Sequence, residues 1–245
     1  MNIALIGYGK MGKEIEKVGA ERKVIIKHVF DSKNNHNGIG LTKQSLKDVD
    51  VCLDFSNPRI TLDIVKAVAE AGKNIVIGTT GWYDKLKDIE KIVRSHKIGF
   101  LYSPNFSLGI NIFYQIVTAS AHYINKFNVY DVAIHEMHHR GKADSPSGTA
   151  LALGQIILQH IHNKKEMLNE TAHKQIQPEQ VHVTSTRIGN VVGTHQVMFD
   201  SDADCIELTH RAKNRSGFAY GALIAAEWLC DKKGFFTMKD VLTSI

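Results

Sequence analysis

The stretch of the chain richest in reactive side chains is HEMHHRGKADSPSGT, at residues 135–149. Within it, His135-Glu136-x-x-His139 matches the H-E-x-x-H signature of zinc proteases. In that signature a helix brings both histidines onto one face, about 6 Å apart, so that they can bind one metal ion. A zinc site here therefore requires that this part of the chain be helical.

The residues that lead into the motif, VYDVAI, indicate a strand instead, because they are largely β-branched or aromatic and alternate in polarity. At a rise of roughly 3.3 Å per residue, His135 and His139 would lie about 13 Å apart on a strand, too far to share one ion. Gly141, Asp144 and Pro146 would also interrupt a helix. We therefore predict no metal in this stretch.

On a strand, His138 and His139 point to opposite sides, and the chain then enters a loop that carries Lys142. Ser147 is a suitable N-cap for a following helix, and Gly148 and Thr149 would present free backbone N–H groups. A helix N-terminus beside a lysine is suited to a carboxylate or a phosphate, and histidine can transfer protons near neutral pH. The alternative is a solvated basic loop with surface histidines.

The first strand, NIALIG, runs into Gly7-Tyr8-Gly9-Lys10-Met11-Gly12, which is G-x-G-x-x-G at the opening of a helix. The first glycine permits the tight turn, the second lets the backbone approach a pyrophosphate, and the third allows close packing of helix on strand. The motif predicts dinucleotide binding. A glycine-rich turn without a ligand is the alternative.

Asp31 ends the second strand, where an acid bonds the adenine ribose hydroxyls and favours NAD. Lys33 could instead pair with a 2′-phosphate, and Asp31 could be a simple turn residue, so the sequence leaves the cofactor preference open. Two further strand ends, at residues 54–58 and 78–81, are polar and rich in turn residues. Ligands of such sheets bind at these ends, so we expect both to line the nicotinamide side.

Short β-type runs alternate with helical stretches through the first 105 residues, which predicts a parallel sheet covered on both faces. The pattern changes after Ser103, where a long helix, a strand and a second helix precede three β-runs in sequence. Those runs favour a mixed or antiparallel sheet. The fold class is therefore α/β, a Rossmann-type parallel-sheet domain plus an α+β mixed-sheet domain.

The chain has 245 residues and a formal net charge of +5. Its lysines and arginines are scattered, so we predict no nucleic-acid partner. No apolar run reaches the roughly 18 residues that a membrane span needs, so we predict no membrane association. The first residues enter a strand without a leader pattern, which indicates a cytoplasmic protein.

The segment from Glu136 to Ala150, E-x-H-H-R-x-K-x-D-x-P-S-G-T-A, resembles the signature of the dihydrodipicolinate reductase (4-hydroxy-tetrahydrodipicolinate reductase) family. The resemblance extends over the chain, through the glycine loop, DFSNP at 54–58, GTTG at 78–81, PNFSLGIN at 104–111, TRIGNVVGTH at 186–195 and GFAYGAL at 217–223.

The resemblance implies an enzyme of lysine and diaminopimelate biosynthesis that reduces a cyclic dicarboxylate with NADH or NADPH, without a metal. It implies a dinucleotide-binding Rossmann domain at residues 1–106 and 216–245, and a substrate-binding and tetramerisation domain at residues 107–215. The family usually forms a homotetramer. Another NAD(P)-dependent dehydrogenase and a non-catalytic dinucleotide-binding regulator remain alternatives.

Carried over by position, the resemblance implies that His138 is the catalytic proton donor or acceptor and that Lys142 is the other proton donor. It also implies that His139, Gly148 and Thr149 bind a substrate carboxylate. The cofactor contacts implied are Gly7, Tyr8, Gly9, Lys10, Met11, Gly12, Asp31, Gly78, Thr79, Thr80, Ser103, Pro104, Asn105 and Phe106. Many relatives have a longer glycine loop with Arg in place of Lys10, which leaves the phosphate contacts open.

Overall fold

The computed structural model describes residues 1–35 and 38–244, which divide into two compact units. Unit 1 comprises Met1–Leu108 and Arg215–Ile245, and unit 2 comprises Gly109–Asn214. The C-terminal segment therefore packs with the N-terminal part of the chain.

Unit 1 is built on a six-stranded parallel sheet in the order β11-β5-β4-β3-β1-β2. Its central strands β3 and β4 are buried along their whole length, as expected where helices cover both faces of a parallel sheet. The strands are β1 (Asn2–Ile6), β2 (Ile25–Phe30), β3 (Val51–Asp54), β4 (Asn74–Ile77), β5 (Gly99–Tyr102) and β11 (Gly234–Thr237).

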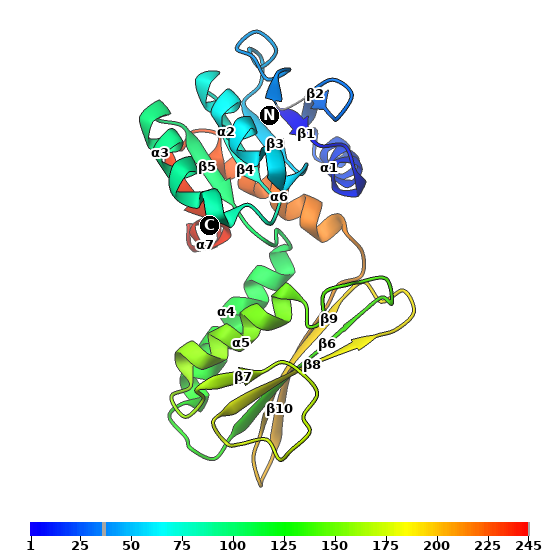
Figure 1. The fold of residues 1–245 in the computed structure, drawn as a ribbon, viewed down its shortest axis with the longest axis vertical. Coiled ribbons are helices and arrows are strands. Elements are labelled where there is room, and N and C mark those ends of the chain that lie inside the picture. The colour runs from blue at the N-terminus through cyan, green and yellow to red at the C-terminus, as the bar shows by residue number, and fades with distance from the viewer. Residues whose placement is uncertain (36–37, 245) are drawn as a thin grey trace. The chain divides into compact units, whose positions relative to one another are not determined.

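Helices cover the two faces of this sheet (Figure 1). On one face, α1 (Lys10–Glu21) packs against α6 (Ser216–Leu229) over a core that includes Leu5 and Leu53. On the other, α2 (Thr61–Glu70) and α3 (Leu86–His96) enclose a second core, and short 3-10 turns precede both helices. A final short helix, α7 (Met238–Thr243), joins the first core.

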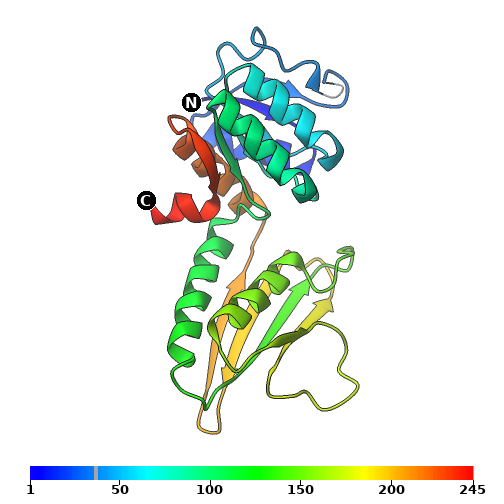
Figure 2. The ribbon, with the colours of Figure 1, turned by 60° about the vertical axis from the view of Figure 1, so that its left-hand side comes forward.

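Unit 2 is a five-stranded mixed sheet in the order β10-β9-β6-β8-β7. The central strand β6 runs parallel to β8 and antiparallel to β9. Both α4 (Leu108–Ile124) and α5 (Gly148–His160) lie on the same face of the sheet (Figures 1 and 2). The strands are β6 (Asp131–His138), β7 (Glu166–Leu168), β8 (Gln180–Arg187), β9 (Thr194–Asp200) and β10 (Cys205–Arg211).

The predicted fold class, a Rossmann-type parallel sheet plus a mixed-sheet domain, is confirmed. The strand expected over residues 129–138 is confirmed as β6, Asp131–His138, so the helix that a H-E-x-x-H zinc site requires is not present. Three short elements were not expected from the sequence: β7, β11 and α7.

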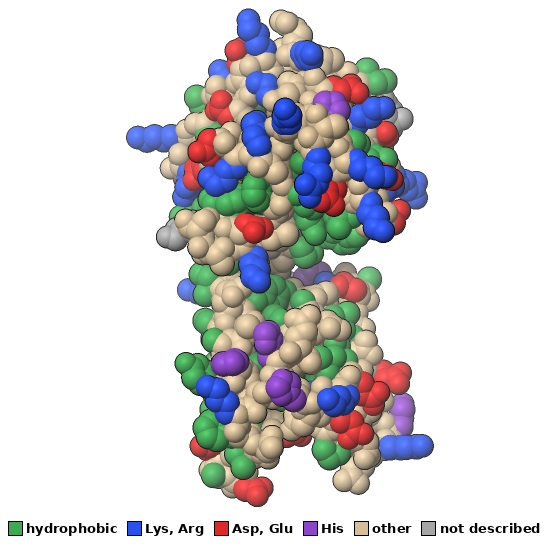
Figure 3. All heavy atoms as spheres, turned by 90° about the vertical axis from the view of Figure 1, so that its left-hand side faces the viewer, with side chains coloured by type: hydrophobic (Ala, Val, Ile, Leu, Met, Phe, Trp, Pro, Cys, Tyr) green, Lys and Arg blue, Asp and Glu red, His purple; other side chains and the backbone are tan. Residues whose placement is uncertain are grey.

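Within residues 1–35 and 38–244, no helix combines the length and apolar character needed to cross a bilayer. On the face shown in Figure 3, lysine and arginine side chains are interspersed with aspartate and glutamate and do not form one continuous basic patch.

Candidate active site

In unit 1, the predicted cofactor residues lie where strands end at one edge of the sheet. Backbone hydrogen bonds connect the successive loops: Gly7 N–H donates to the Phe30 carbonyl at 2.7 Å, Gly78 N–H to the Asp54 carbonyl at 2.8 Å, and Ser103 N–H to the Ile77 carbonyl at 3.2 Å. Because the strands are parallel, the predicted cofactor residues of four separate segments come together at this edge. These segments are residues 7–12, Asp31, residues 78–80 and residues 103–106.

The glycine loop has the geometry that a pyrophosphate requires. Gly7 has φ +91°, and a Cβ there would lie 2.4 Å from the Phe55 carbonyl oxygen. A Cβ on Gly12 would lie 2.4 Å from the Gly7 carbonyl oxygen, whereas one on Gly9 would meet nothing within 4 Å. Gly9 is the N-cap of α1, no side chain caps that helix, and its first turn has no acidic residue. The loop therefore fits a dinucleotide phosphate.

The buried carboxylate of Asp54 joins two of the loops. Its oxygens accept from the Ser56 backbone N–H at 3.1 Å and from Thr79 Oγ1 at 3.1 Å, and Ser56 Oγ is a third donor. Burial raises the pKa of Asp54 to about 6, although the hydrogen bonds from Ser56 and Thr79 oppose the shift. This network fixes the 78–81 loop on the 54–58 loop.

A pocket opens at the same edge, and it contains five of the predicted cofactor residues. Phe55 forms part of its wall and packs against Phe106, with ring centroids 5.8 Å apart. Arg215 and Phe218, which are not among the predicted cofactor residues, also line it. The lining is Met11, Phe55, Gly78, Pro104, Asn105, Phe106, Arg215 and Phe218.

Asp31 directly follows β2, and its Oδ1 accepts the backbone N–H of Lys33 at 2.8 Å. The Asp31 carboxylate therefore stabilises the turn after β2 through Oδ1, and Oδ2 takes no part in that contact. The Tyr8 hydroxyl donates a hydrogen bond to Glu16 in the second turn of α1. Lys33 and Asp31 are thus close neighbours at the end of the second strand.

In unit 2, β6 alternates between its two faces. His135 faces away from the helices, where its Nδ1 lies 2.8 Å from Thr184 Oγ1. Glu136 and His138 face the helix side and are buried. The strand ends at His138, and half-buried His139 begins the loop. His138 is therefore buried at the last position of the strand, whereas His139 lies beyond the strand, in the loop.

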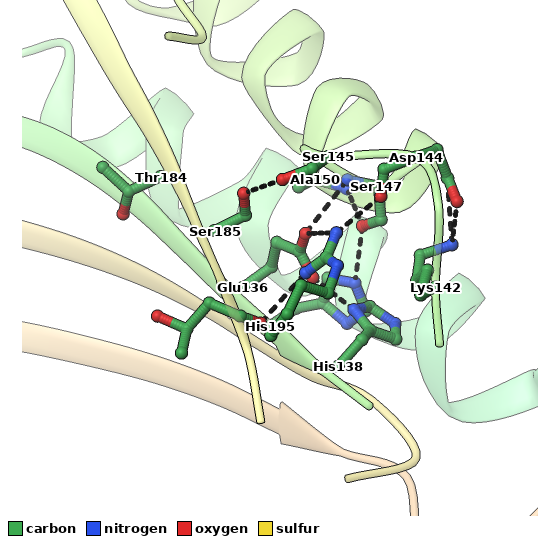
Figure 4. Close-up of polar contacts among 12 residues, drawn as sticks. Glu136, His138, Lys142, Asp144, Ser145, Ser147, Ala150, Thr184, Ser185 and His195 are labelled. Atoms are coloured by element: carbon green, nitrogen blue, oxygen red, sulfur yellow. Dashed lines mark hydrogen bonds and ion pairs between the residues drawn. The ribbon is translucent and has the colours of Figure 1, made fainter. Parts of the chain in front are cut away.

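Glu136 is fully buried and accepts hydrogen bonds from three different elements (Figure 4). His138 Nδ1 contacts Oε2, while Arg187 Nη2 at 2.7 Å and the Ser147 backbone N–H at 3.1 Å both contact Oε1. Burial alone would raise the pKa of Glu136, but the hydrogen bonds from His138 and Arg187 outweigh it and lower the pKa to about 2. The carboxylate is therefore charged at neutral pH.

His195 on β9 packs edge-on against His138, with ring centroids 5.2 Å apart. Burial, followed by the positive charge of His138, lowers the pKa of His195 to about 3. A neutral His195 can accept at Nε2 from the Ser147 hydroxyl, which lies 3.3 Å away and itself accepts the Ala150 N–H as the N-cap of α5. His195 thus shields His138 from solvent without adding a second charge.

Lys142 lies in the loop between β6 and α5 and holds the carboxylate of Asp144, with Nζ–Oδ distances of 2.8 and 2.9 Å (Figure 4). The hydrogen bond from Lys142 lowers the pKa of Asp144, and the Gly148 backbone N–H contributes in the same direction. Gly148 is the first residue of α5, and Thr149 bonds Tyr114. Lys142 and the helix N-terminus therefore already face one carboxylate together.

Among the described residues, the group whose side-chain atoms could hold a metal ion is Glu136, His138 and His195, with one potential ligand atom from each within 4.8 Å of the others. It does not use the H-E-x-x-H pair His135 and His139. Both carboxylate oxygens of Glu136 already accept hydrogen bonds, and the Arg187 guanidinium beside them repels a cation. The donor set therefore fits a hydrogen-bonded network better than a metal.

Glu136, Arg187 and His195 are not among the predicted site residues, although all three lie inside the motifs at 136–150 and 186–195. The pairing register supplies the missing signal, because Glu136 lies opposite His195 on β9 and Met137–His138 opposite Thr186–Arg187 on β8.

Known proteins of one family are similar to this chain over nearly its whole length. Models described as the N-terminus and the C-terminus of dihydrodipicolinate reductase match residues 1–106 and 109–242. The 4-hydroxy-tetrahydrodipicolinate reductase of Christiangramia forsetii is 40% identical over 249 residues, covering 100% of this chain and 99% of the relative. The 4-hydroxy-tetrahydrodipicolinate reductase of Archaeoglobus fulgidus is 36% identical, covering 99% of this chain and 100% of the relative. A dipicolinate-bound dihydrodipicolinate reductase from Paenisporosarcina sp. TG-14 has the same fold, with a TM-score of 0.78, 23% identity and 98% coverage of both chains.

Proposed function

The chain belongs to the dihydrodipicolinate reductase family, and from this premise we propose that it reduces 4-hydroxy-tetrahydrodipicolinate to tetrahydrodipicolinate with NADH or NADPH. The reaction belongs to lysine and diaminopimelate biosynthesis. The observation that carries the proposal is the full-length match to a reductase at 40% identity. It favours this activity over another dehydrogenase or a non-catalytic regulator.

The direct test is a coupled assay that follows NADH and NADPH oxidation while the substrate is generated enzymatically. We expect oxidation that depends on both the enzyme and the generated substrate. Oxidation of neither nucleotide would refute the proposed function, and the ratio of the two rates gives the cofactor preference.

The dinucleotide binds the glycine loop, Asp31, the 78–80 segment and the 103–106 segment, and it supplies the hydride when bound. The support is the open space beside Gly9, the uncapped start of α1 and the pocket containing Phe106. Arg215 and Phe218 line that pocket too, so we add them to the cofactor residues.

The substrate carries two carboxylates, and one of them binds Lys142, the backbone N–H groups of Gly148 and Thr149, and His139. Asp144 supports this role, because its own carboxylate already contacts both Lys142 and the Gly148 N–H. A lysine and a helix N-terminus together favour an anion.

His138 delivers the proton to the substrate carbon that becomes electron-rich when the ring is reduced. It is a buried imidazole held by a charged carboxylate at the end of β6. General acid catalysis supplies ~10²–10⁴-fold in rate. Lys142 has its Nζ in an ion pair with Asp144 in this structure, so we assign it to binding first and to proton transfer second.

We further propose that the site uses no metal, because both carboxylate oxygens of Glu136 already accept hydrogen bonds. The enzyme is a cytoplasmic homotetramer without nucleic-acid or membrane partners. The sheet of unit 2 supports the assembly, because α4 and α5 cover only one of its faces (Figure 2). Sedimentation equilibrium measures the subunit number.

A further inference from the structure

We propose that Glu136 is a positioning residue that fixes the proton on Nδ1 of His138 and, through a different oxygen atom, orders the carboxylate-binding end of α5. This inference rests on the proposed function only in taking His138 as the proton donor. The carboxylate itself lies inside unit 2, below the surface that a substrate would reach. Glu136 therefore acts through His138 and Ser147, not by touching the substrate.

The two oxygens of Glu136 have separate partners. Oε2 accepts from His138 Nδ1, whereas Oε1 accepts from Arg187 Nη2 at 2.7 Å and from the Ser147 backbone N–H at 3.1 Å. A buried carboxylate without such partners would be strongly destabilising. Here β6, β8 and the N-cap of α5 each supply a donor, so the charge is fully compensated and its orientation is fixed.

The contact at Oε2 determines which ring nitrogen of His138 carries the proton when the ring is neutral. A charged carboxylate can only accept, so Nδ1 must carry a proton, and Nε2 is the nitrogen that exchanges a proton with a ligand. Gly193 leaves room at this nitrogen, because a Cβ there would lie 2.9 Å from Nε2. Neutral His195 packs on the ring and adds no charge.

The proton transfer then balances. The Nε2–H bond of the His138 imidazolium breaks, and a C–H bond forms from the electron pair on the substrate carbon. The ring is left neutral, with its remaining proton on Nδ1 and held by Glu136. A proton from solvent restores the imidazolium after product leaves. If Nδ1 faced no acceptor, the neutral ring could carry its single proton on Nε2 instead. Donation of that proton to the substrate would leave an imidazolate anion.

Glu136→Gln tests this because the two oxygens have different partners. The amide oxygen should stay with Arg187 and Ser147, which are both donors, and the amide NH₂ should then face His138 Nδ1. That reverses the hydrogen bond and moves the proton of a neutral ring to Nε2. Arg187 keeps the Thr186 and Asp144 carbonyls as acceptors, at 3.0 and 2.5 Å.

For Glu136→Gln we expect kcat to fall at least about tenfold, within the ~10²–10⁴-fold range of general acid catalysis. The Kd for dipicolinate should stay within about twofold, because the Ser147 contact is retained. Long-range ¹H–¹⁵N NMR should show the neutral ring protonated on Nδ1 in the wild type and on Nε2 in the variant. Glu136→Ala should weaken dipicolinate binding as well, since it removes both contacts.

A double-mutant cycle separates positioning from a general structural role. Glu136→Gln should lower kcat in the wild type but not in a His138→Gln background, since the two act as one unit. Glu166→Gln is the matched control, because that carboxylate accepts from Gln180 at 2.8 Å on the same sheet and is exposed. It should leave kcat unchanged.

Additive losses in the double variant, or a wild-type His138 whose neutral ring is protonated on Nε2, would overturn the proposal. The wild-type NMR measurement needs no variant to fold and no turnover. A wild-type enzyme that shows the Nδ1–H ring but no NAD(P)H oxidation would instead refute the proposed function and leave the positioning role standing.

Discussion

Lys142 Nζ lies 2.8 Å from Oδ1 and 2.9 Å from Oδ2 of Asp144, so the lysine that we assign to the substrate holds a carboxylate of its own chain. The Gly148 N–H at the start of α5 faces the same carboxylate. Asp144 is mostly exposed, with 59% of its side chain accessible, so it can leave this position at low cost. If these donors bind a substrate carboxylate as we propose, the Asp144 side chain competes with it for them.

Asp144→Asn should therefore tighten dipicolinate binding, by roughly two- to fivefold, because an exposed ion pair contributes up to about 1 kcal/mol. Isothermal titration calorimetry at low ionic strength measures the change. Asp88→Asn, which removes an exposed pair with Lys91 on α3, is the control. Weaker binding by the Asp144 variant would mean that Asp144 orients Lys142 instead of competing for it.

Lys142→Met should raise the Kd for dipicolinate at least about tenfold, since a charge-assisted hydrogen bond contributes ~1.5–3 kcal/mol. The kcat should fall less than KM rises if binding is its main role. Steady-state kinetics together with calorimetry distinguish the two effects. A large fall in kcat with unchanged KM and Kd would make Lys142 a proton donor first.

His138→Gln should lower kcat by ~10²–10⁴-fold while leaving the Kd for NADH unchanged. His135→Gln is a matched control, because His135 occupies the opposite face of the same strand, where it contacts Thr184. Single-turnover fluorescence quenching of NADH measures the chemical step and the nucleotide affinity in one experiment. Equal single-turnover rates for the two variants would show that His138 has no role in catalysis.

Local patterns in the sequence predicted much of this geometry. The Gly7–Gly12 loop, the Ser147 cap and the strand at 131–138 depend on glycine conformations, side-chain capping and alternation within a few residues. Each of these features is encoded in neighbouring positions, so reading along the chain is sufficient to find it.

The Glu136 network could not be predicted in this way, because Arg187 is 51 positions away and meets Glu136 only through the register of β6 on β8. Strand register depends on packing across the sheet and not on local propensity. The same holds for β11, whose four residues form a strand only because they pair with β5. Arg215 likewise reaches the pocket near Phe106 because the chain returns to unit 1.

His195 predicts a pH dependence of stability. Its pKa is lowered in the fold from 6.5 to about 3, so the folded state binds fewer protons than the unfolded state between these values. The free energy of unfolding should therefore fall as pH drops from 6.5 toward 3, by up to about 1.4 kcal/mol per pH unit. Urea unfolding followed by circular dichroism tests this.

His195→Gln should flatten that slope, because glutamine does not titrate. His173→Gln, which changes an exposed histidine of the same unit, should leave the slope as in the wild type. Glu136 lowers the free energy of unfolding further at lower pH. Its pKa falls from 4.5 to about 2 in the fold, so this second loss of stability occurs between these two pH values. Equal slopes in the wild type and the His195 variant would show that this imidazole does not control acid unfolding.

Gly9 and Gly12 allow cofactor binding to be separated from folding. A Cβ at position 9 would meet no atom within 4 Å, whereas a Cβ at position 12 would lie 2.4 Å from the Gly7 carbonyl oxygen. Gly9→Ala should therefore keep the melting temperature of the wild type but raise the Kd for NADH about tenfold or more, a loss of about 1.4 kcal/mol, because the methyl group fills the space beside the α1 N-terminus.

Gly12→Ala should lower both stability and affinity, since the backbone must shift to accept the methyl group at a cost of ~1–3 kcal/mol. Thermal denaturation and NADH fluorescence titration of the two variants give the comparison, and Gly72→Ala is unsuitable as a control because that glycine has φ +71°. Gly148→Ala, where the added Cβ would also meet nothing within 4 Å, serves as a control for stability alone. If Gly9→Ala bound NADH as the wild type does, the pyrophosphate would not approach the chain at this loop, and the cofactor assignment of residues 7–12 would be wrong.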